Sequence, residues 1–130
     1  MGPVNWFAVV LAAVVAVAIG LVWHGLVFRT GKPLVPGYSR PAGGYALVIL
    51  ILLIGSIMLG HSFARIGTET LDAKPWLYFM QTGGIAIAFI IPSLWLTLMR
   101  MGSSVGERII ESGYWLVAYL AMGAVFWAIG

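Results

Sequence analysis

The chain has 130 residues, of which 62% are hydrophobic and only 8% carry a charge. Soluble proteins are roughly 45–50% apolar and about 25% charged, and so few charges cannot cover the surface of a small water-soluble domain. This balance excludes soluble enzymes, nucleic-acid-binding proteins and disordered tails, and it predicts an integral membrane protein. The chain has no cysteine, which excludes disulfides and thiolate metal sites.

Four uncharged stretches, each of about 20–25 residues, separate the charged residues of the chain. A helix that rises 1.5 Å per residue needs about 20 residues to cross a ~30 Å hydrocarbon core. Because backbone groups in lipid must be paired within their own segment, each stretch is predicted to be an α-helix. The predicted fold is all-α, a bundle of four transmembrane helices that forms one membrane domain over residues 1–130. The helices are expected at residues 4–28, 44–64, 76–99 and 109–129.

The first helix carries a stripe of small side chains at a spacing of four residues, and the second and fourth helices offer further small residues. Such stripes let helix backbones approach closely, which drives packing where lipid surrounds the helices. The residues predicted to pack helices together are Ala8, Ala12, Ala16, Gly20, Ser56, Gly60, Ala121, Ala124 and Ala128. These faces are interpreted either as packing within one bundle or as an interface with another protein or a second copy.

Two histidines lie in the predicted helices. His24 extends the small-residue stripe of the first helix by one step, and His61 lies near the end of the second. Each is a weak candidate for binding a pigment or haem, because histidine ligates haem iron. Their levels in the membrane are expected to differ by about 18 Å, which excludes joint ligation of one iron. A proton-relay role for either histidine, or for Glu111, is a further alternative.

The third helix is the most polar of the four. Its possible polar path consists of Gln81, Thr82, Pro92, Ser93 and Thr97. The proline has no amide hydrogen and its ring clashes with the carbonyl group four residues earlier, so a kink is expected there. Kinks beside hydroxyl groups line pores or binding cavities in some membrane proteins, although proline is also frequent in ordinary membrane helices.

Two carboxylates lie one turn apart at the start of the fourth helix, Glu107 and Glu111. They are interpreted as a solvated first turn, where negative charge suits the helix dipole. A cation site shared with a partner chain is the alternative. Ser104 lies three residues before Glu107, which is the spacing of a capping box.

Lysine and arginine are unevenly distributed among the predicted loops. The first and third loops contain Arg29, Lys32, Arg40, Arg100 and Arg108, whereas the second contains only Arg65 and Lys74. Positively charged short loops face the cytoplasm. The first and third loops are therefore predicted to be cytoplasmic, with the N- and C-termini outside.

Several short stretches resemble one known family. They are Asn5-Trp6, residues 20–24 (Gly-Leu-Val-Trp-His), residues 111–117 (Glu-Ser-Gly-Tyr-Trp-Leu-Val) and residues 122–124 (Met-Gly-Ala). Together they are similar to the domain of unknown function 1761 family, whose members are small, mostly bacterial membrane proteins with four helices. The resemblance covers most of the chain. It implies this topology and a bacterial cytoplasmic membrane, but no activity and no catalytic residue.

The leading functional hypothesis is a non-enzymatic packing or accessory subunit that associates with other membrane proteins, or with itself, through small-residue helix faces. No catalytic constellation, nucleotide motif or metal motif is present in the sequence. No cofactor, metal or nucleic-acid partner is predicted, and contacts with membrane lipid are expected. One alternative is a homo-oligomeric channel or small-solute transporter whose path is lined by the kinked third helix. A second alternative is a pigment or haem carrier that uses a single histidine.

Overall fold

The computed structural model describes residues 3–28 and 41–129, and in the second range it describes side chains from residue 44 onward. All regular structure in these residues is helical. The elements in chain order are α1 (Trp6–Val22), the π-helical turn η1 (Trp23–Val27), α2 (Pro41–Ile66), α3 (Thr68–Ala73), α4 (Trp76–Ile85), the π-helical turn η2 (Ala86–Ile90), α5 (Ile91–Arg100) and α6 (Val105–Ile129).

Four continuous helical stretches are long and apolar enough to cross a membrane: Trp6–Val27, Gly44–Ile66, Trp76–Arg100 and Val105–Ile129. The predicted all-α fold with four membrane-spanning helices is therefore confirmed. We refer to these stretches as the first to fourth spans.

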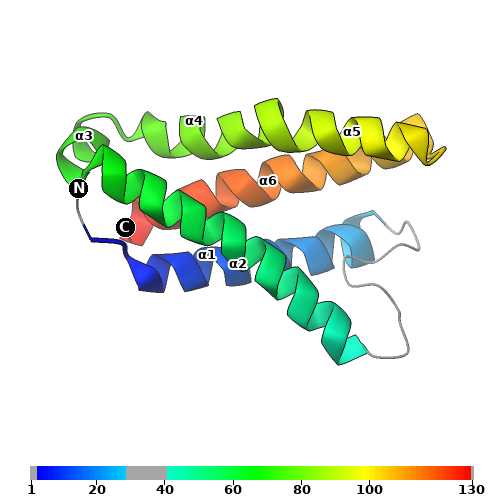
Figure 1. Cartoon of the computed structure of the whole chain (residues 1–130), viewed down its shortest axis with the longest axis horizontal. Coiled ribbons are helices and arrows are strands. Elements are labelled where there is room, and N and C mark those ends of the chain that lie inside the picture. Colours follow the sequence, from blue (N-terminus) through cyan, green and yellow to red (C-terminus); the bar gives the residue numbers. More distant parts are fainter. Residues whose placement is uncertain (1–2, 29–40, 130) are drawn as a thin grey trace.

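Helix α1 packs against both α2 and α6, and α6 packs in turn against α4 and α5 (Figure 1). The first and fourth spans run antiparallel. At one end, the Asn5 side-chain amide donates to the Ile129 carbonyl oxygen at 2.8 Å. Further along, the Tyr114 hydroxyl donates to the Ala16 carbonyl oxygen at 2.9 Å. The first and last described turns of the chain therefore meet at the same end of the bundle.

Polar caps decide where two of the spans begin. The Asn5 side chain accepts a hydrogen bond from the Ala8 amide at 3.1 Å and starts α1. The Ser104 hydroxyl accepts one from the Glu107 amide at 3.2 Å. Helix α6 consequently starts at Val105, four residues before the predicted position, because a capped first turn tolerates charged residues that the hydrophobic pattern excludes.

A short helix between the second and third spans was not predicted. It is α3, and it starts directly after Gly67, whose φ of 93° is open to glycine at little cost. The chain turns at this glycine and enters α3, in which only Leu71 is buried.

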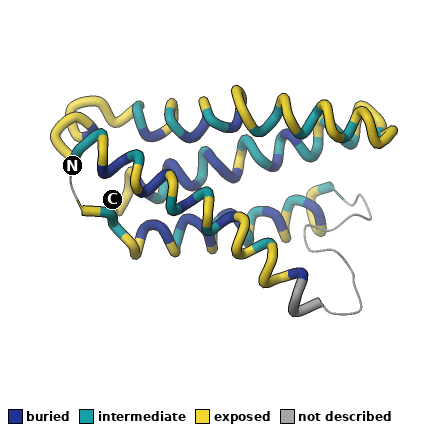
Figure 2. Tube along the Cα trace, in the orientation of Figure 1, coloured by how far each residue is buried: buried dark blue, intermediate teal, exposed yellow. Residues whose placement is uncertain are grey.

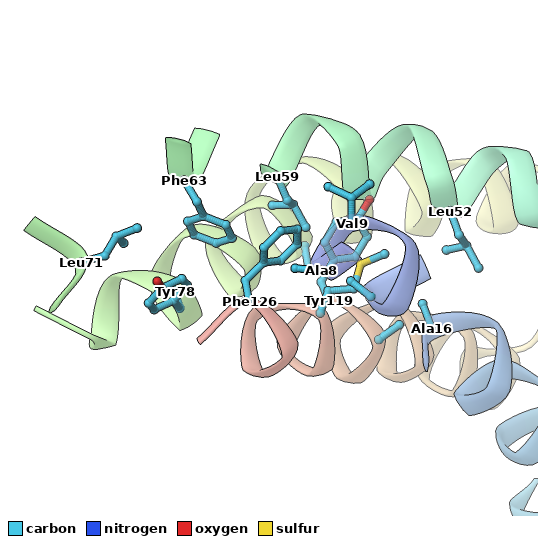
Figure 3. Close-up of a cluster of buried hydrophobic side chains, with 14 of the residues drawn as sticks. Ala8, Val9, Ala16, Leu52, Leu59, Phe63, Leu71, Tyr78, Tyr119 and Phe126 are labelled. Carbon is cyan, nitrogen blue, oxygen red and sulfur yellow. The ribbon is translucent and has the colours of Figure 1, made fainter. Parts of the chain in front are cut away.

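The core is apolar along α1 and becomes aromatic toward the end of the bundle that carries α3 (Figure 3). The Phe63 ring lies between Tyr78 and Phe126, at centroid distances of 4.8 Å and 5.1 Å. Three spans meet at these rings, because the three residues belong to α2, α4 and α6.

The third span contains a wide helical turn just before Pro92. The Ile91 amide bonds to the Ala86 carbonyl oxygen, five residues back, as in a π-helix. Proline cannot donate an amide hydrogen and crowds the preceding turn, and the wider turn accommodates it. The sequence predicts a kink at Pro92, and the structure has a π-helical turn directly before it.

The spans differ in how far the chain itself covers them (Figure 2). Within its most apolar window, 39% of the fourth span is buried but only 17% of the third. Helix α5 has no buried residue. The third span therefore presents the largest uncovered side of the four.

Candidate functional site

A histidine–glutamate pair forms a largely buried polar contact between the first and fourth spans, near one end of the bundle. His24 lies in η1 and is 4% exposed. Its Nε2 atom lies 3.1 Å from Oε1 of Glu111, whose side chain is 28% exposed. Its Nδ1 atom lies 3.0 Å from the Gly20 carbonyl oxygen. Both ring nitrogens of His24 are therefore hydrogen-bonded within the chain.

Two aromatic residues hold this pair in place. The Tyr114 ring meets the His24 ring edge-on, at a centroid distance of 5.2 Å. The Trp23 indole N–H donates to the Ile110 carbonyl oxygen at 3.0 Å and so ties η1 to α6 on the other side of the histidine. Gly113 leaves room for the indole, since a Cβ atom there would lie 3.0 Å from it.

The sequence interpretation missed this pair. It treated Glu111 as part of a solvated first turn, whereas the structure places its carboxylate on the buried His24. The signal was available in the stripe of the first helix. Its small residues face α6, so the next residue at the same spacing, His24, faces α6 as well.

His61 lies at the opposite end of the bundle. Its ring packs edge-on against Trp6 at 5.8 Å, and its Nδ1 atom lies 2.9 Å from the Ile57 carbonyl oxygen. Trp6 precedes His24 by 18 residues of helix, which corresponds to about 27 Å. The two histidines are thus too far apart to ligate one iron, as the sequence predicts. Ligation by His24 alone requires the loss of one of its two hydrogen bonds.

The small-residue stripe of the first helix packs inside the chain. Ala8, Ala12 and Ala16 are fully buried, and Gly20 is buried as well. Ser56 on α2 is also fully buried, and its hydroxyl donates to the Val9 carbonyl oxygen at 2.6 Å. These faces are occupied by the bundle itself, so they are not open to another protein.

The packing face of the fourth helix is displaced from the predicted one. Ala121 and Ala124 are only half-buried, and Ala128 is exposed. The buried residues of α6 are Ser112, Tyr114, Ala118, Tyr119, Met122, Gly123 and Phe126. Small size alone did not identify this face, because the aromatic residues of α6 pack inward.

Glycines mark the closest contacts between helices. A Cβ atom at Gly60 would lie 2.6 Å from a methyl group of Val9, in agreement with the predicted packing role of Gly60. A Cβ atom at Gly55 would lie 2.5 Å from the Tyr119 hydroxyl. Gly123 is equally tight against α4. Gly55 and Gly123 were not among the predicted packing residues.

The polar residues of the third helix do not line one path through the chain. Thr82 is fully buried, and its hydroxyl donates to the Tyr78 carbonyl oxygen at 2.9 Å. Gln81 is half-buried, whereas Pro92, Ser93 and Thr97 are exposed on the outside of the bundle. The Ser93 hydroxyl donates to the Phe89 carbonyl oxygen at 2.8 Å.

Two hollows of similar size lie elsewhere. One, of about 390 Å³, lies beside the start of α1 and is lined in part by Asn5, Phe63, Tyr78 and Phe126. The other, of about 400 Å³, is an apolar groove between α1 and α2. Neither contains Gln81, Ser93 or Thr97. Over residues 3–28 and 41–129, no group of three or more metal-binding side chains is close enough to hold an ion.

Comparison with known proteins places the chain in a family. No curated protein and no solved structure gives a significant match. A family model described as "Protein of unknown function (DUF1761)" matches residues 7–127, a range that contains all four spans except their outermost residues and includes both His24 and Glu111. The chain therefore belongs to the DUF1761 family.

Proposed function

We propose that this protein is a non-enzymatic accessory subunit of a bacterial cytoplasmic membrane, and that it associates side by side with another membrane protein or with a second copy. The contact surface we assign is the outer side of the third span. The sequence hypothesis placed this contact on the small-residue faces of α1 and α2, but those faces are buried within the bundle. The first and third loops face the cytoplasm in this proposal, and the termini face outward.

The observation that supports the proposal is the kind of side chain exposed on the third span. Gly84, Ala88, Ser93 and Thr97 are all exposed. The first and last steps between them are four residues long and the middle one is five, and the π-helical turn η2 absorbs the extra residue. We call these four residues the outer small-residue face. Small and hydroxyl-bearing side chains allow close helix contact within lipid.

The exposed side of the second span provides the contrast. Large apolar residues are exposed on both spans, including Ile87 and Phe89 on the third, but on the second span no row of small and hydroxyl-bearing residues runs between them. On the second span these large residues suit contact with lipid chains. Examples are Leu47, Leu50, Ile51, Ile54 and Met58. Two outward surfaces of one bundle thus differ in character, and only the third span combines small size with hydroxyl groups along one side.

Because the chain has no cysteine, single-cysteine variants test the proposal directly. Ala88→Cys places a thiol on the outer small-residue face near the middle of the third span. Ile54→Cys is the matched control, since this exposed residue lies near the middle of the second span. Mild oxidation or a short thiol cross-linker is applied in native membranes.

We expect Ala88→Cys to give a cross-linked species in high yield, either a dimer or a heavier adduct with another membrane protein, and Ile54→Cys to remain monomeric. Replacement of Ala88 by leucine is expected to abolish the complex in blue-native electrophoresis, because the larger side chain prevents close approach. Equal cross-linking of both cysteine variants, or a monomer throughout, would contradict the proposal.

The second candidate is a homo-oligomeric channel in which several copies turn the outer small-residue face toward a common axis. It is favoured by the exposed positions of Ser93 and Thr97, which lie outside the single bundle. Flux across liposomes distinguishes the two candidates. A channel loses its flux in a Thr97→Leu variant, whereas an accessory subunit has no flux to lose.

A further inference from the structure

The pair formed by His24 and Glu111 has hydrogen-bonding geometry that fixes where protons must be. The Gly20 carbonyl oxygen, 3.0 Å from Nδ1, can only accept a hydrogen bond. Nδ1 therefore carries a hydrogen and donates it. The imidazole is left with Nε2 facing a carboxyl oxygen at 3.1 Å.

That remaining contact holds only if one proton lies between the two atoms. Either Nε2 is protonated and the glutamate is ionised, or Nε2 is bare and the glutamic acid donates its hydrogen. Both arrangements contain one proton and are neutral as a pair. Without it, the lone pair of Nε2 faces a negatively charged carboxylate inside the bundle, which is strongly unfavourable.

We propose that His24 and Glu111 form a binding site for one proton that holds the first span against the fourth and exchanges with the aqueous phase. Access is through the glutamate, because Glu111 is partly exposed while His24 is enclosed. The site lies near the end of the bundle where α5 leads into α6. When the proton leaves, the contact between η1 and α6 at this end is weakened.

The hydroxyl and guanidinium groups nearest to the pair make other contacts, so they do not share its proton. The Tyr114 hydroxyl is turned away from it, since it donates to the Ala16 carbonyl oxygen. Arg108 is engaged elsewhere, since its Nη2 atom donates to the Ser103 carbonyl oxygen in the segment between α5 and α6, and its guanidinium lies over the ring of Trp95 in α5. The guanidinium therefore does not compete for the carboxylate of Glu111.

Other titratable groups on the neighbouring elements are few. In α1 and η1, His24 is the only one. Helix α6 adds Glu107, one turn before Glu111, and Tyr119, two turns beyond it. Helix α5 ends on Arg100, and α2 contributes only Tyr45 between residues 44 and 60. Glu107 is thus the nearest carboxylate on the same helix, and it provides the matched control.

Nitrogen NMR of the protein in lipid nanodiscs, labelled with ¹⁵N in the imidazole ring, tests the site. A His61→Gln background leaves His24 as the only signal, and His61 is remote from the pair. We expect Nδ1 to remain protonated and hydrogen-bonded across the titration. We expect Nε2 to lose its hydrogen-bonded signal in one step as the pH rises.

Two variants then identify the carboxylate that shares the proton with His24. In Glu111→Gln the amide N–H donates to Nε2 without a removable proton, so the hydrogen-bonded signal is expected to persist at alkaline pH. In Glu107→Gln, we expect the Nε2 signal of His24 to change with pH as it does in the parent protein. An unprotonated Nδ1 in the parent protein would overturn the proposal without any variant, and so would equal effects of the two substitutions.

Thermal stability gives an independent readout. The folded state binds this proton and the unfolded chain has no such pair, so the stabilisation is present at low pH and is lost as the pH rises. The melting temperature of the parent should fall through this step, and that of Glu111→Gln should not. None of these measurements depends on association through the third span, so the two proposals fail separately.

Discussion

Gly123 lies where α6 meets α4, and the contact leaves no room for a side chain. A Cβ atom at this position would lie 2.6 Å from Thr82 Oγ1 and 2.9 Å from the Tyr78 carbonyl oxygen. An ordinary contact begins at 3.4 Å, so α4 has to move outward by about 0.5–0.8 Å to relieve both contacts. The Thr82 hydroxyl cannot simply rotate away, because it donates to that same carbonyl oxygen.

The magnitude of a Gly123→Ala substitution follows from these contacts. Overpacking of a closely packed contact costs about 1–3 kcal/mol, and the disturbed hydrogen bond adds about 1 kcal/mol. Alanine recovers roughly 0.5–1 kcal/mol through its higher helix propensity. We therefore expect Gly123→Ala to lower the free energy of unfolding by about 1–3.5 kcal/mol.

Gly84→Ala provides the matched control, since a Cβ atom there has nothing within 4 Å. It gains only the helix propensity, so we expect its free energy of unfolding to rise by roughly 0.5–1 kcal/mol. Reversible unfolding of the detergent-solubilised monomer, followed by circular dichroism, measures both variants. Stabilisation by Gly123→Ala equal to that by Gly84→Ala would refute the close contact between α4 and α6.

Three further substitutions test single polar contacts by the same unfolding assay. Tyr114→Phe removes the hydroxyl that donates to the Ala16 carbonyl oxygen, and we expect the free energy of unfolding to fall by about 0.6–1.5 kcal/mol. An unchanged free energy of unfolding would contradict this contact between α1 and α6. Ser56→Ala removes the bond to the Val9 carbonyl oxygen and should cost about as much, whereas a stabilised variant would argue against that contact. Ser104→Ala removes the cap of α6 and should cost about 1 kcal/mol, with a loss of helix signal confined to the first turn.

The four spans were predictable because lipid imposes a simple condition on each segment. A backbone in hydrocarbon must pair all its polar groups internally, so length and lack of charge suffice to locate a span. The boundary of α6 was less predictable. Its first turn is charged, and the Ser104 cap extends the helix beyond the apolar run.

The direction in which each helix faces was only partly predictable. The stripe from Ala8 to Gly20 identified the buried side of α1, because small side chains there permit close approach. In α6 the same rule selected residues beside the buried face, since Ala121 and Ala124 are only half-buried while Tyr114 and Phe126 pack inward. Aromatic rings fill the wider gaps between helices, and the sequence does not give the width of those gaps.

The pairing of His24 with Glu111 joins residues 87 positions apart. The sequence pattern places both residues near the same end of the bundle, but they come into contact only because α1 packs against α6. The orientation prediction rests partly on Arg29, Lys32 and Arg40, which lie outside the described residues. It stays a prediction.

Side-specific thiol labelling tests the membrane topology most directly. Asp72 in α3 and Ser104 before α6 are both exposed and lie on either side of the third span. A membrane-impermeant thiol reagent added to intact cells is expected to label Asp72→Cys and to reach Ser104→Cys only after the membrane is opened. Labelling of both cysteines from the outside of intact cells would contradict a third span that crosses the membrane.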